Sequence, residues 1–504
     1  MDTRAAYDEL IKEYKIVSTL GSIEGLLHWD LQTMMPHKGA PRRSDQMAII
    51  SGLGHQKLTS TKMRDLIGTL NTENIEEDTL TAEERANLRE IDRDFTRATK
   101  LPQDLVEELT RQRSKCHTVW EAAREAGDFS KFAPDLEKLV ELTKQMAEYL
   151  GYEDTPLDAL IDEYEPDATA KSLTVLFDEA KKATIPLLNK VLESPVKAKF
   201  DFEKHIFTTE KQKAFGEEIT AAIGFDKQAS RLDTAVHPFC SGGRGDVRIT
   251  TRYNEHAPQQ AIFGIIHETG HGLYEQGVRE DTLGTPLSQA LSYGLHESQS
   301  RMWENIVGRS LPFWKFAYPM LTKYFGNELK GMSVEDWVLA VNHVERSLVR
   351  VEADELTYDL HIILRFEVER DLFDGTISVS DLPRVWNKKF EDYLGLTPPN
   401  DGKEGVMQDI HWAMGSFGYF PSYSVGNIAA AQFWAKMKQD MPKLEQQIES
   451  GDFKDVLHWL VKNVHEMGRR YSRDELMKRA TGTPLDVKHY AQYLTEKFGK
   501  LYGV

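Results

Sequence analysis

Two histidines four residues apart flank a glutamate in the segment His267-Glu268-Thr269-Gly270-His271. On a helix, residues four apart share one face, so both imidazoles can reach a single ion while the glutamate projects beside them. Neutral imidazoles are typical zinc ligands, and zinc lowers the pKa of a bound water molecule towards neutrality. The pattern therefore predicts a hydrolytic zinc site with His267 and His271 as ligands and Glu268 as the general base.

The residues around this motif predict that it lies on a buried helix over 258–276. Pro258 suits a first helical turn, and residues 259–266 are too apolar for a solvated helix face. The alternative is an accidental match to the motif on an ordinary surface helix. The apolar context argues against that alternative, because a surface helix would show polar residues on its outer side.

A catalytic zinc site needs a third protein ligand and leaves its fourth position to water. The extended metzincin motif requires a glycine and a histidine where this chain has Tyr274 and Gly277, so that subclass is excluded. The other common arrangement takes a glutamate from a following helix. Glu297 and Glu304 both qualify, because residues seven apart lie on nearly the same helical face, and spacing alone leaves both open.

The elements that must position these residues are predicted to be mainly α-helical. Apolar residues recur at steps of three and four along residues 4–27, which indicates an amphipathic helix that ends near His28-Trp29-Asp30. Capping boxes, Thr81 with Glu84 and Ser472 with Glu475, are typical of helix starts. Further helices are predicted over 42–70, from 82 onward, and over 103–127, 130–150, 168–193, 286–308, 350–372, 381–396, 427–449 and 483–499.

Strand character is clear in one place, residues 246–253, where β-branched and aromatic residues alternate with polar ones. The preceding residues 242–245 suit a hairpin turn because three of the four are glycines. The edge of a small sheet beside the zinc helix can pair with an extended peptide; the alternative is a purely structural hairpin. We therefore expect a mainly α protein with one small β-sheet beside the active site.

Composition limits the setting of the protein. The 504 residues include no linker-like or repetitive segment, so we expect a single domain over 1–504. With 62 basic and 80 acidic residues the net charge is −18, which argues against nucleic-acid and anionic-membrane partners. Two cysteines, Cys116 and Cys240, are too few for a disulfide framework. Residues 1–9 contain no apolar signal core, so we expect a soluble, cytoplasmic protein.

Several short motifs, taken together and in order, resemble the M32 family of metallocarboxypeptidases, which is typified by thermostable carboxypeptidase Taq. Near the N-terminus, Trp29-Asp30, Met35-Pro36 and Gly39-Ala40 are also similar to that family. One departure is Val349, where the family usually has isoleucine or asparagine before the arginine. The motifs that carry the resemblance are 237–239 (HPF), 246–250 (DVRIT), 267–271 (HETGH), 296–299 (HESQ), 349–354 (VRVEAD) and 405–412 (GVMQDIHW).

The resemblance implies a large multi-helix gluzincin-type peptidase with a deep groove, commonly a homodimer. Helices of residues 1–200 would form a wall of the groove, and residues 201–504 would carry the metal site. It also implies that Glu297 is the third ligand and that Co²⁺ or Mn²⁺ can replace Zn²⁺. The implied reaction removes single residues from peptide C-termini.

Three other functions compete with the carboxypeptidase. Oligo-endopeptidases and dipeptidyl carboxypeptidases of the related gluzincin type share the same metal motif. A non-catalytic zinc-binding protein is disfavoured by Glu268, because a structural zinc has no use for a base.

The resemblance also implies roles for residues outside the metal motif. Arg350 would bind the substrate's terminal carboxylate, and the alternative is an ion pair with Asp354 four residues on. His411 and Tyr423 would donate hydrogen bonds to the scissile carbonyl as it becomes an oxyanion. The alternative for both is an ordinary core position.

Three more residues complete the candidate site. Asp409 would orient His411 or a metal histidine. His237 and Arg248 would contact the substrate backbone or shape the pocket; the alternative is that they stabilise the hairpin. The sequence suggests no role for Cys116 or Cys240.

Overall fold

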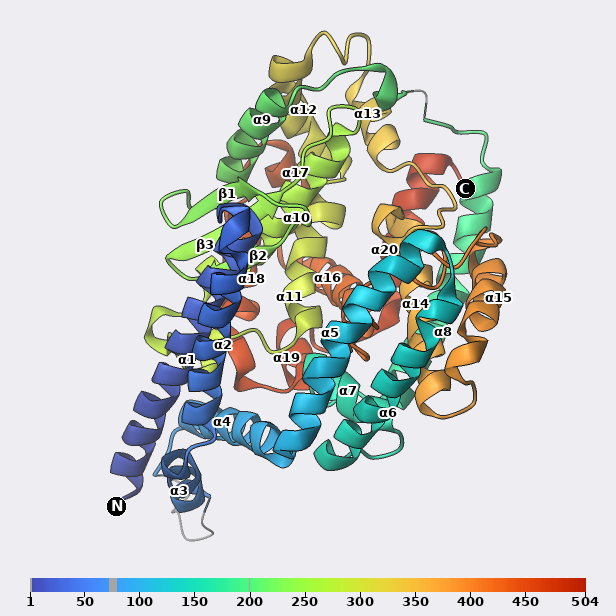
Figure 1. Cartoon of the computed structure of the whole chain (residues 1–504). Helices are drawn as coiled ribbons and strands as arrows, with labels where there is room; N and C mark the ends of the chain where they lie inside the picture. The colour runs from blue at the N-terminus through green and yellow to red at the C-terminus, as the bar shows by residue number, and fades with distance from the viewer. Residues whose placement is uncertain (1, 72–78, 199) are drawn as a thin grey trace.

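The structure is a computed structural model, and it describes residues 2–71, 79–198 and 200–504. Most of it is helical, as the mainly α fold class predicts, and the described residues include one three-stranded sheet (Figure 1). None of the described helices is both long and apolar enough to cross a membrane. The helices are α1 (Thr3–Thr33), α2 (Ala40–Leu58), α3 (Thr61–Leu70), α4 (Ala82–Lys100), α5 (Gln103–Ala126), α6 (Ala133–Leu150), α7 (Pro156–Tyr164), α8 (Ala170–Glu193), α9 (Thr209–Ala222), α10 (Pro258–Gly277), α11 (Tyr293–Arg301), α12 (Leu311–Phe325), α13 (Val334–Val341), α14 (Glu355–Phe373), α15 (Leu382–Leu394), α16 (Pro421–Asp440), α17 (Leu444–Glu449), α18 (Lys454–Asn463), α19 (Arg473–Thr481) and α20 (Val487–Tyr502).

The sheet consists of β1 (Ser230–Thr234), β2 (Cys240–Gly243) and β3 (Asp246–Thr251), in the order β1-β3-β2. β1 runs parallel to β3, and β2 runs antiparallel to it. The predicted strand and hairpin turn are confirmed. Gly242 has a φ of 88°, and a Cβ there would come within 1.9 Å of the Asp246 carbonyl oxygen, so this turn requires glycine.

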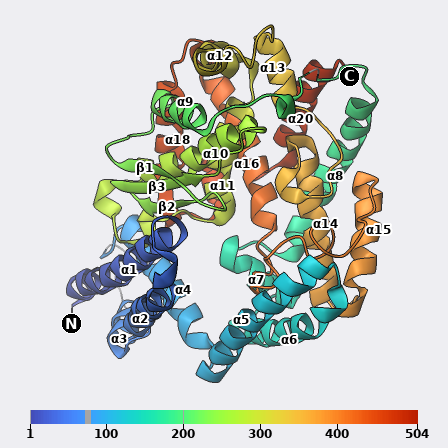
Figure 2. The same cartoon turned by 45° about the horizontal axis from the view of Figure 1, so that its top comes forward.

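Close approaches at two glycines bring together the helices that build the site. A Cβ on Gly270 of α10 would lie 2.6 Å from the Cα of Ser300, so α10 and α11 pack backbone against backbone. A Cβ on Gly426 of α16 would lie 2.7 Å from the Cγ of Glu297 on α11. Figure 2 shows these three helices next to one another, to the right of the sheet. Their shared interface belongs to the main hydrophobic core of the molecule.

A second, smaller hydrophobic cluster lies apart from the main core. It joins α1, α3 and α4, which stand at one side of the molecule with α2 (Figures 1 and 2). α2 contributes no buried residue and packs mainly along α1. The members of the cluster are Ala6, Tyr7, Leu10, Tyr14, Met63, Leu66, Ile67, Leu70, Leu80, Leu88 and Ile91.

Two of the predicted helix boundaries in the first part of the chain are wrong. α1 continues beyond the predicted end at 28–30 to Thr33, and Trp29 is buried beneath the guanidinium groups of Arg231 and Arg248. The single helix predicted over 42–70 is two helices. The Ser60 hydroxyl accepts a hydrogen bond from the Met63 N–H and starts α3.

Three boundaries in the second part also differ from the predictions. The helix expected from 286 starts at Tyr293, capped by Ser292, while Pro286 opens a short 3₁₀ turn. Arg350 lies in a 3₁₀ turn, and α14 begins at Glu355 with Asp354 as its N-cap. The helix expected over 427–449 is divided into α16 and α17. Helices α7, α9, α12, α13 and α18 and strand β1 were not predicted.

Candidate metal centre and active site

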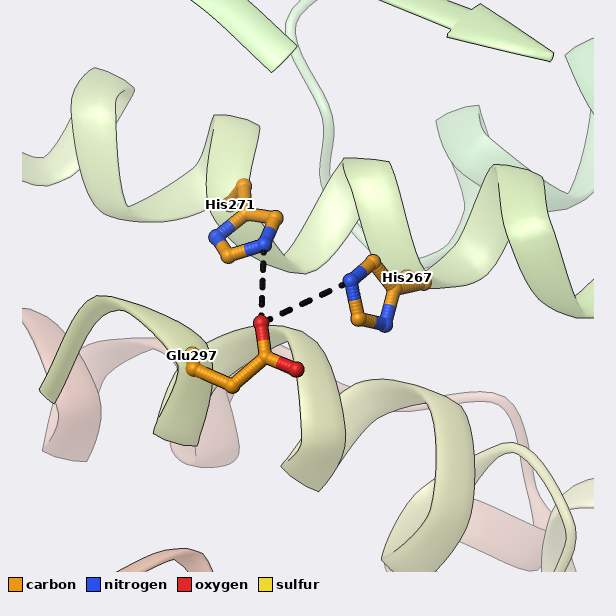
Figure 3. A group of neighbouring side chains, drawn as sticks. All are labelled: His267, His271 and Glu297. Atoms are coloured by element: carbon orange, nitrogen blue, oxygen red, sulfur yellow. Dashed lines mark ion pairs between the residues drawn. The ribbon is translucent and has the colours of Figure 1, made fainter. Parts of the chain in front are cut away.

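The side chains of His267, His271 and Glu297 converge between α10 and α11 (Figure 3). The Glu297 Oε2 lies 3.2 Å from Nε2 of His271 and 3.6 Å from Nε2 of His267. The candidate ligand atoms of all three residues lie within 4.8 Å of one another. The structure thus brings Glu297, rather than Glu304, to the two histidines.

The hydrogen bonds of the two histidines fit a metal. Nδ1 of His267 is 2.9 Å from Oε2 of Glu304, and Nδ1 of His271 is hydrogen-bonded to Nδ1 of His296. Both Nδ1 atoms are therefore engaged on the side away from Glu297, which leaves the Nε2 lone pairs for an ion. Two imidazole nitrogens and one carboxylate are a donor set typical of catalytic zinc.

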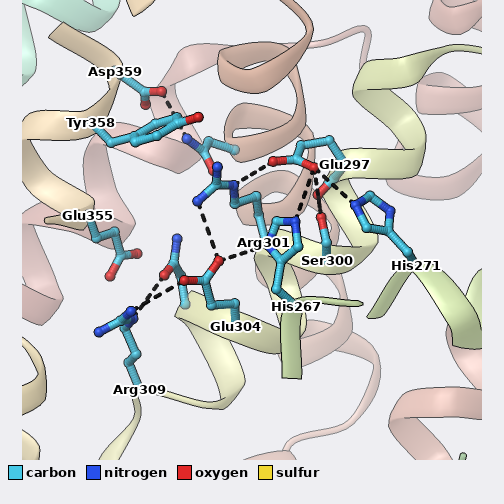
Figure 4. A network of polar contacts seen from close by, with 12 residues as sticks. His267, His271, Glu297, Ser300, Arg301, Glu304, Arg309, Glu355, Tyr358 and Asp359 are labelled. Carbon is cyan, nitrogen blue, oxygen red and sulfur yellow. Dashed lines mark hydrogen bonds and ion pairs between the residues drawn. The ribbon is translucent and has the colours of Figure 1, made fainter. Parts of the chain in front are cut away.

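An arginine network fixes the glutamates around this cluster (Figure 4). Arg301 donates to Glu297 Oε1 at 2.6 Å, and Ser300 donates to Glu297 Oε2 at 3.0 Å. Arg309 donates to Glu304 Oε1 at 3.2 Å. We did not predict these partners, although the four-residue step from Glu297 to Arg301 is a recognisable ion-pair spacing.

His296 links His271 to a further carboxylate. With Nε2 of His271 free for the metal, its Nδ1–H donates to Nδ1 of His296, whose Nε2–H donates to Glu275 at 2.9 Å. This chain of hydrogen bonds fixes the orientation of the His271 ring. His296 belongs to a motif that we recognised in the sequence, but neither its role nor Glu275 was predicted.

Glu268 lies beside the metal ligands on α10 and lines the groove, although only 6% of its surface is exposed. Burial, followed by the nearby charges of Glu297 and Glu304, raises its pKa to about 7 against the opposing effect of His267. A carboxylate with a pKa near neutrality is suited to accept and return a proton.

The groove above the metal ligands is a cavity of about 1000 Å³. α10 and α11 contribute the metal ligands and Glu268 to its lining. α4 to α7 contribute a wall rich in charged residues, and the segment leading into β2 contributes Pro238, Phe239 and Cys240. Three tyrosines that were not predicted, Tyr164, Tyr293 and Tyr419, line the cavity with their ring centroids 4.9 to 5.5 Å apart.

Tyr423 lines this groove, and His411 lies behind it. Nε2 of His411 is 3.4 Å from the phenol oxygen of Tyr423. Burial and the charges of Arg350 and Arg365 outweigh Asp409 and lower the pKa of His411 to about 3, so its ring is neutral. The two residues predicted to donate to the scissile carbonyl are neighbours, but only Tyr423 is among the residues that line the cavity.

Arg350 is engaged with Asp409 behind Tyr423. Its Nε and Nη2 both donate to Oδ1 of Asp409, at 2.9 and 2.7 Å, and Arg365 donates to Oδ2 at 2.7 Å. The alternative pair of Arg350 with Asp354 does not form, because Asp354 caps α14. Within the described residues, the hydrogen bonds of the Asp409 carboxylate are to these two arginines and not to a histidine. An orienting role of Asp409 for His411 stays a prediction.

His237 and Arg248 stand away from the groove lining. His237 is exposed. Arg248 makes a two-pronged ion pair with Asp246 at 2.9 and 3.0 Å, and its guanidinium lies 4.3 Å from the ring centroid of Trp29. These contacts favour the alternative, in which Arg248 stabilises the hairpin.

Comparison with known proteins agrees with this geometry. The sequence model of the family described as carboxypeptidase Taq (M32) metallopeptidase matches residues 9–498. The chain belongs to this metallopeptidase family. It is 41% identical to carboxypeptidase 1 of Bacillus subtilis and to thermostable carboxypeptidase 1 of Thermus thermophilus, over the full length of each protein. The crystal structure of an M32 carboxypeptidase from Deinococcus radiodurans superposes with a TM-score of 0.96 at 38% identity, covering 99% of this chain and 100% of that one.

Proposed function

We propose that the protein is a zinc-dependent carboxypeptidase that releases single amino acids from the C-termini of peptides. The observation that carries the proposal is the convergence of His267, His271 and Glu297 beside Glu268 at the groove. These three ligands suit Zn²⁺, and Co²⁺ or Mn²⁺ are substitutes. When bound, the ion acts as a Lewis acid that acidifies water and polarises a carbonyl group.

The residues of the chain divide the remaining work. Glu268 accepts the proton of the attacking water and delivers it to the leaving amine. Tyr423 donates its phenol hydrogen to the scissile carbonyl oxygen as negative charge develops there. His411, as the neutral tautomer with its hydrogen on Nε2, donates to the phenol oxygen of Tyr423. This hydrogen bond directs the phenol hydrogen towards the substrate.

Arg350 supplies the positive charge for the substrate's terminal carboxylate. Arg350 and Arg365 share one carboxylate, Asp409, so the trio carries an excess charge of +1 behind Tyr423. The Arg350 guanidinium lies 5.1 Å from the Tyr423 ring centroid, close to the proposed site of reaction.

The role of Arg350 is tested with free and amidated peptides. We expect Arg350→Ala to lower kcat/KM by about tenfold to a few hundredfold on a free C-terminus, the size of a charge-assisted contact. Amidation of the peptide C-terminus should lower the kcat/KM of the variant much less than that of the wild type. If amidation and mutation instead lower kcat/KM independently, Arg350 does not bind the terminal carboxylate. Its role is then to hold together the cluster of Arg350, Arg365 and Asp409.

The reaction itself is tested by mass spectrometry of one digested peptide, with and without a chelator. Losses of one residue at a time that stop with chelator support the proposal. Losses of two residues indicate a dipeptidyl carboxypeptidase, and internal fragments indicate an oligo-endopeptidase. A protein that binds zinc but cleaves no peptide in a mixed library is a structural zinc protein.

The proposed setting is a cytoplasmic homodimer that acts on peptides and binds neither nucleic acid nor membranes. The free thiols of Cys116 and Cys240 fit a reducing compartment, and the net charge of −18 argues against nucleic-acid and anionic-membrane partners. The homodimer rests on the family resemblance. Light scattering after size exclusion tests the oligomeric state: a mass near 57.6 kDa would contradict the dimer.

A further inference from the structure

One arginine in the groove has no acidic partner. Arg113 projects from α5 and lines the same cavity as the metal ligands. Its Nε is buried without a hydrogen-bond partner, and no ion pair joins it to a carboxylate within residues 2–71, 79–198 and 200–504. A guanidinium carries a permanent charge and five N–H donors. This side chain therefore retains the capacity to bind an anion.

The other arginines that line the cavity are already paired. Arg93 and Arg97 donate to Asp162 at 2.8 and 2.9 Å. Arg469 donates to Asp94 at 3.1 and 3.2 Å. The carboxylates on this wall thus pair with the other three arginines, and the charge of Arg113 remains uncompensated.

Neighbouring groups hold the Arg113 side chain in place. Gly415 has a φ of +70°, and a Cβ there would lie 2.8 Å from the Arg113 Nε, so the stem packs closely on this loop. Arg113 and Tyr164 line the same cavity, and Arg113 is one of the charged groups that act on the Tyr164 phenol, whose pKa is raised by burial. Glu163 is also near Tyr164, but its carboxylate lies 3.7 Å from Arg97.

Arg113 shares the cavity with Tyr164, and the ring of Tyr419 contacts both Tyr164 and Tyr423, the residue at the proposed site of reaction. The ring centroids of Tyr164 and Tyr419 are 4.9 Å apart, and those of Tyr419 and Tyr423 are 5.3 Å apart. An extended peptide advances about 3.3 to 3.6 Å per residue. A substrate group at Arg113 therefore belongs to a residue two or more positions from the scissile bond. A carboxypeptidase leaves only one residue on the C-terminal side, so that group lies on the N-terminal side.

We propose that Arg113 forms a subsite that binds the side-chain carboxylate of an aspartate or glutamate located N-terminal to the scissile bond. The proposal rests on the carboxypeptidase function proposed above. A planar guanidinium can donate two parallel hydrogen bonds to a carboxylate, and the tyrosines between it and the metal provide apolar faces for the intervening backbone. The subsite makes the enzyme selective for acidic residues upstream of the residue that it removes.

Paired peptides that differ only by aspartate or asparagine at one position test this subsite. The position is scanned from the second to the fourth residue before the scissile bond, with a neutral C-terminal residue throughout. At one position we expect the wild type to prefer aspartate by about tenfold to a hundredfold in kcat/KM. Arg113→Met should remove the preference, and Arg113→Glu should transfer it to a lysine peptide.

Arg111→Met is the matched control, because Arg111 lies on the same helix but is 71% exposed and pairs with Glu107. It should keep the aspartate preference. An aspartate-to-asparagine ratio near one at every position, or a ratio unchanged in Arg113→Met, overturns the proposal. The proposal is also overturned if Arg113→Met removes only the drop in kcat/KM that C-terminal amidation of the peptide causes. Arg113 would then bind the terminal carboxylate of the substrate.

A binding measurement separates failure of the subsite from failure of the proposed function. The Kd of each paired peptide is measured by titration calorimetry in the Glu268→Gln background, which does not depend on turnover. A difference of at least about tenfold in Kd that Arg113→Met removes supports the subsite even if no peptide is cleaved. Cleavage of the asparagine peptides without any preference in kcat/KM or Kd leaves the proposed function intact and refutes the subsite.

Discussion

Glu297 and Glu304 face opposite nitrogens of the same imidazole. Glu297 lies on the Nε2 side of His267 at 3.6 Å, and Glu304 lies 2.9 Å from its Nδ1. The cause is local: residues 302–307 form a π-helical turn, so a seven-residue step no longer returns to the same face. One glutamate is thereby placed to bind the metal and the other to orient a ligand.

This division of roles predicts different responses to the same substitution. Glu297→Ala removes a ligand, so we expect the purified protein to lose its zinc. Glu304→Ala removes only a partner of His267 and should weaken metal affinity by about tenfold to a hundredfold. Metal titration against a competing chelator measures both. Full zinc stoichiometry in Glu297→Ala together with loss in Glu304→Ala would exchange the two assignments.

Glu268→Gln separates the base from the ligands. The amide keeps the size of the side chain but cannot accept the proton of water. We expect kcat to fall by about a hundredfold to ten-thousandfold, with zinc still bound. Elemental analysis of the assayed sample supplies the control. Near-normal turnover in a zinc-loaded variant would contradict the role of Glu268.

Tyr423 is expected to act on the transition state more than on the bound substrate. The hydrogen bond from its phenol to the carbonyl oxygen is strongest once that oxygen carries negative charge. Tyr423→Phe should therefore lower kcat by about tenfold to a thousandfold and change KM much less. Steady-state kinetics on one peptide distinguish the two parameters. An effect on KM alone would make Tyr423 a substrate-binding residue.

At the scale of elements, the approach of α16 to α11 depends on Gly426. An alanine there would place its Cβ 2.7 Å from Glu297 Cγ, so either the helix or the ligand must move. We expect Gly426→Ala to lower stability by about 1 to 3 kcal/mol and to weaken zinc binding. Thermal unfolding and chelator competition measure the two effects.

Gly52 on α2 provides the control for this substitution, because a Cβ there meets nothing within 4 Å. Gly52→Ala should leave zinc binding unchanged and stabilise the helix by up to about 1 kcal/mol. Equal zinc affinity in both variants would show that α16 does not position the ligand.

The sequence allowed the elements with strong local signals to be predicted. The capping boxes at Thr81 and Ser472 and the glycine turn before β3 are confirmed, since each is fixed by residues three or four apart. The metal cluster was also predictable, because His267 and His271 lie on one helix and family resemblance selected Glu297. The boundary at Arg350 was missed because Arg350, Asp354 and Tyr358 recur at four-residue steps, as on one helix face. Asp354 is instead the N-cap at which α14 begins, so Arg350 lies before the helix.

Residues that depend on long-range packing could not be predicted in this way. Arg350 and Arg365 meet Asp409 across more than forty residues of sequence, and no local spacing indicates that contact. The same holds for Tyr164, which reaches Tyr419 only because α7 packs beside the loop before α16. Such contacts are set by tertiary structure and override local patterns.

At the scale of the whole molecule, the groove is lined by elements of two hydrophobic cores of unequal size. The smaller core joins α1, α3 and α4, and Arg469 connects it to the rest of the chain by pairing with Glu90 and Asp94 at 2.8 and 3.1 Å. A region with few buried contacts opens with a lower free energy than the main core. We therefore expect the α1–α3 region to unfold locally while the metal site stays folded.

Leu10→Ala tests this separation, because Leu10 is fully buried in the smaller core. Loss of its side chain should destabilise that core by about 2 to 5 kcal/mol. Amide hydrogen exchange should then accelerate in α1 and α3 and remain slow in α10 and α11, with zinc content unchanged. Leu360→Ala, at a fully buried position of α14 in the main core, should instead accelerate exchange throughout α10 and α11. If Leu10→Ala speeds exchange equally in all four helices, the two cores unfold as one cooperative unit and the groove has no independently opening wall.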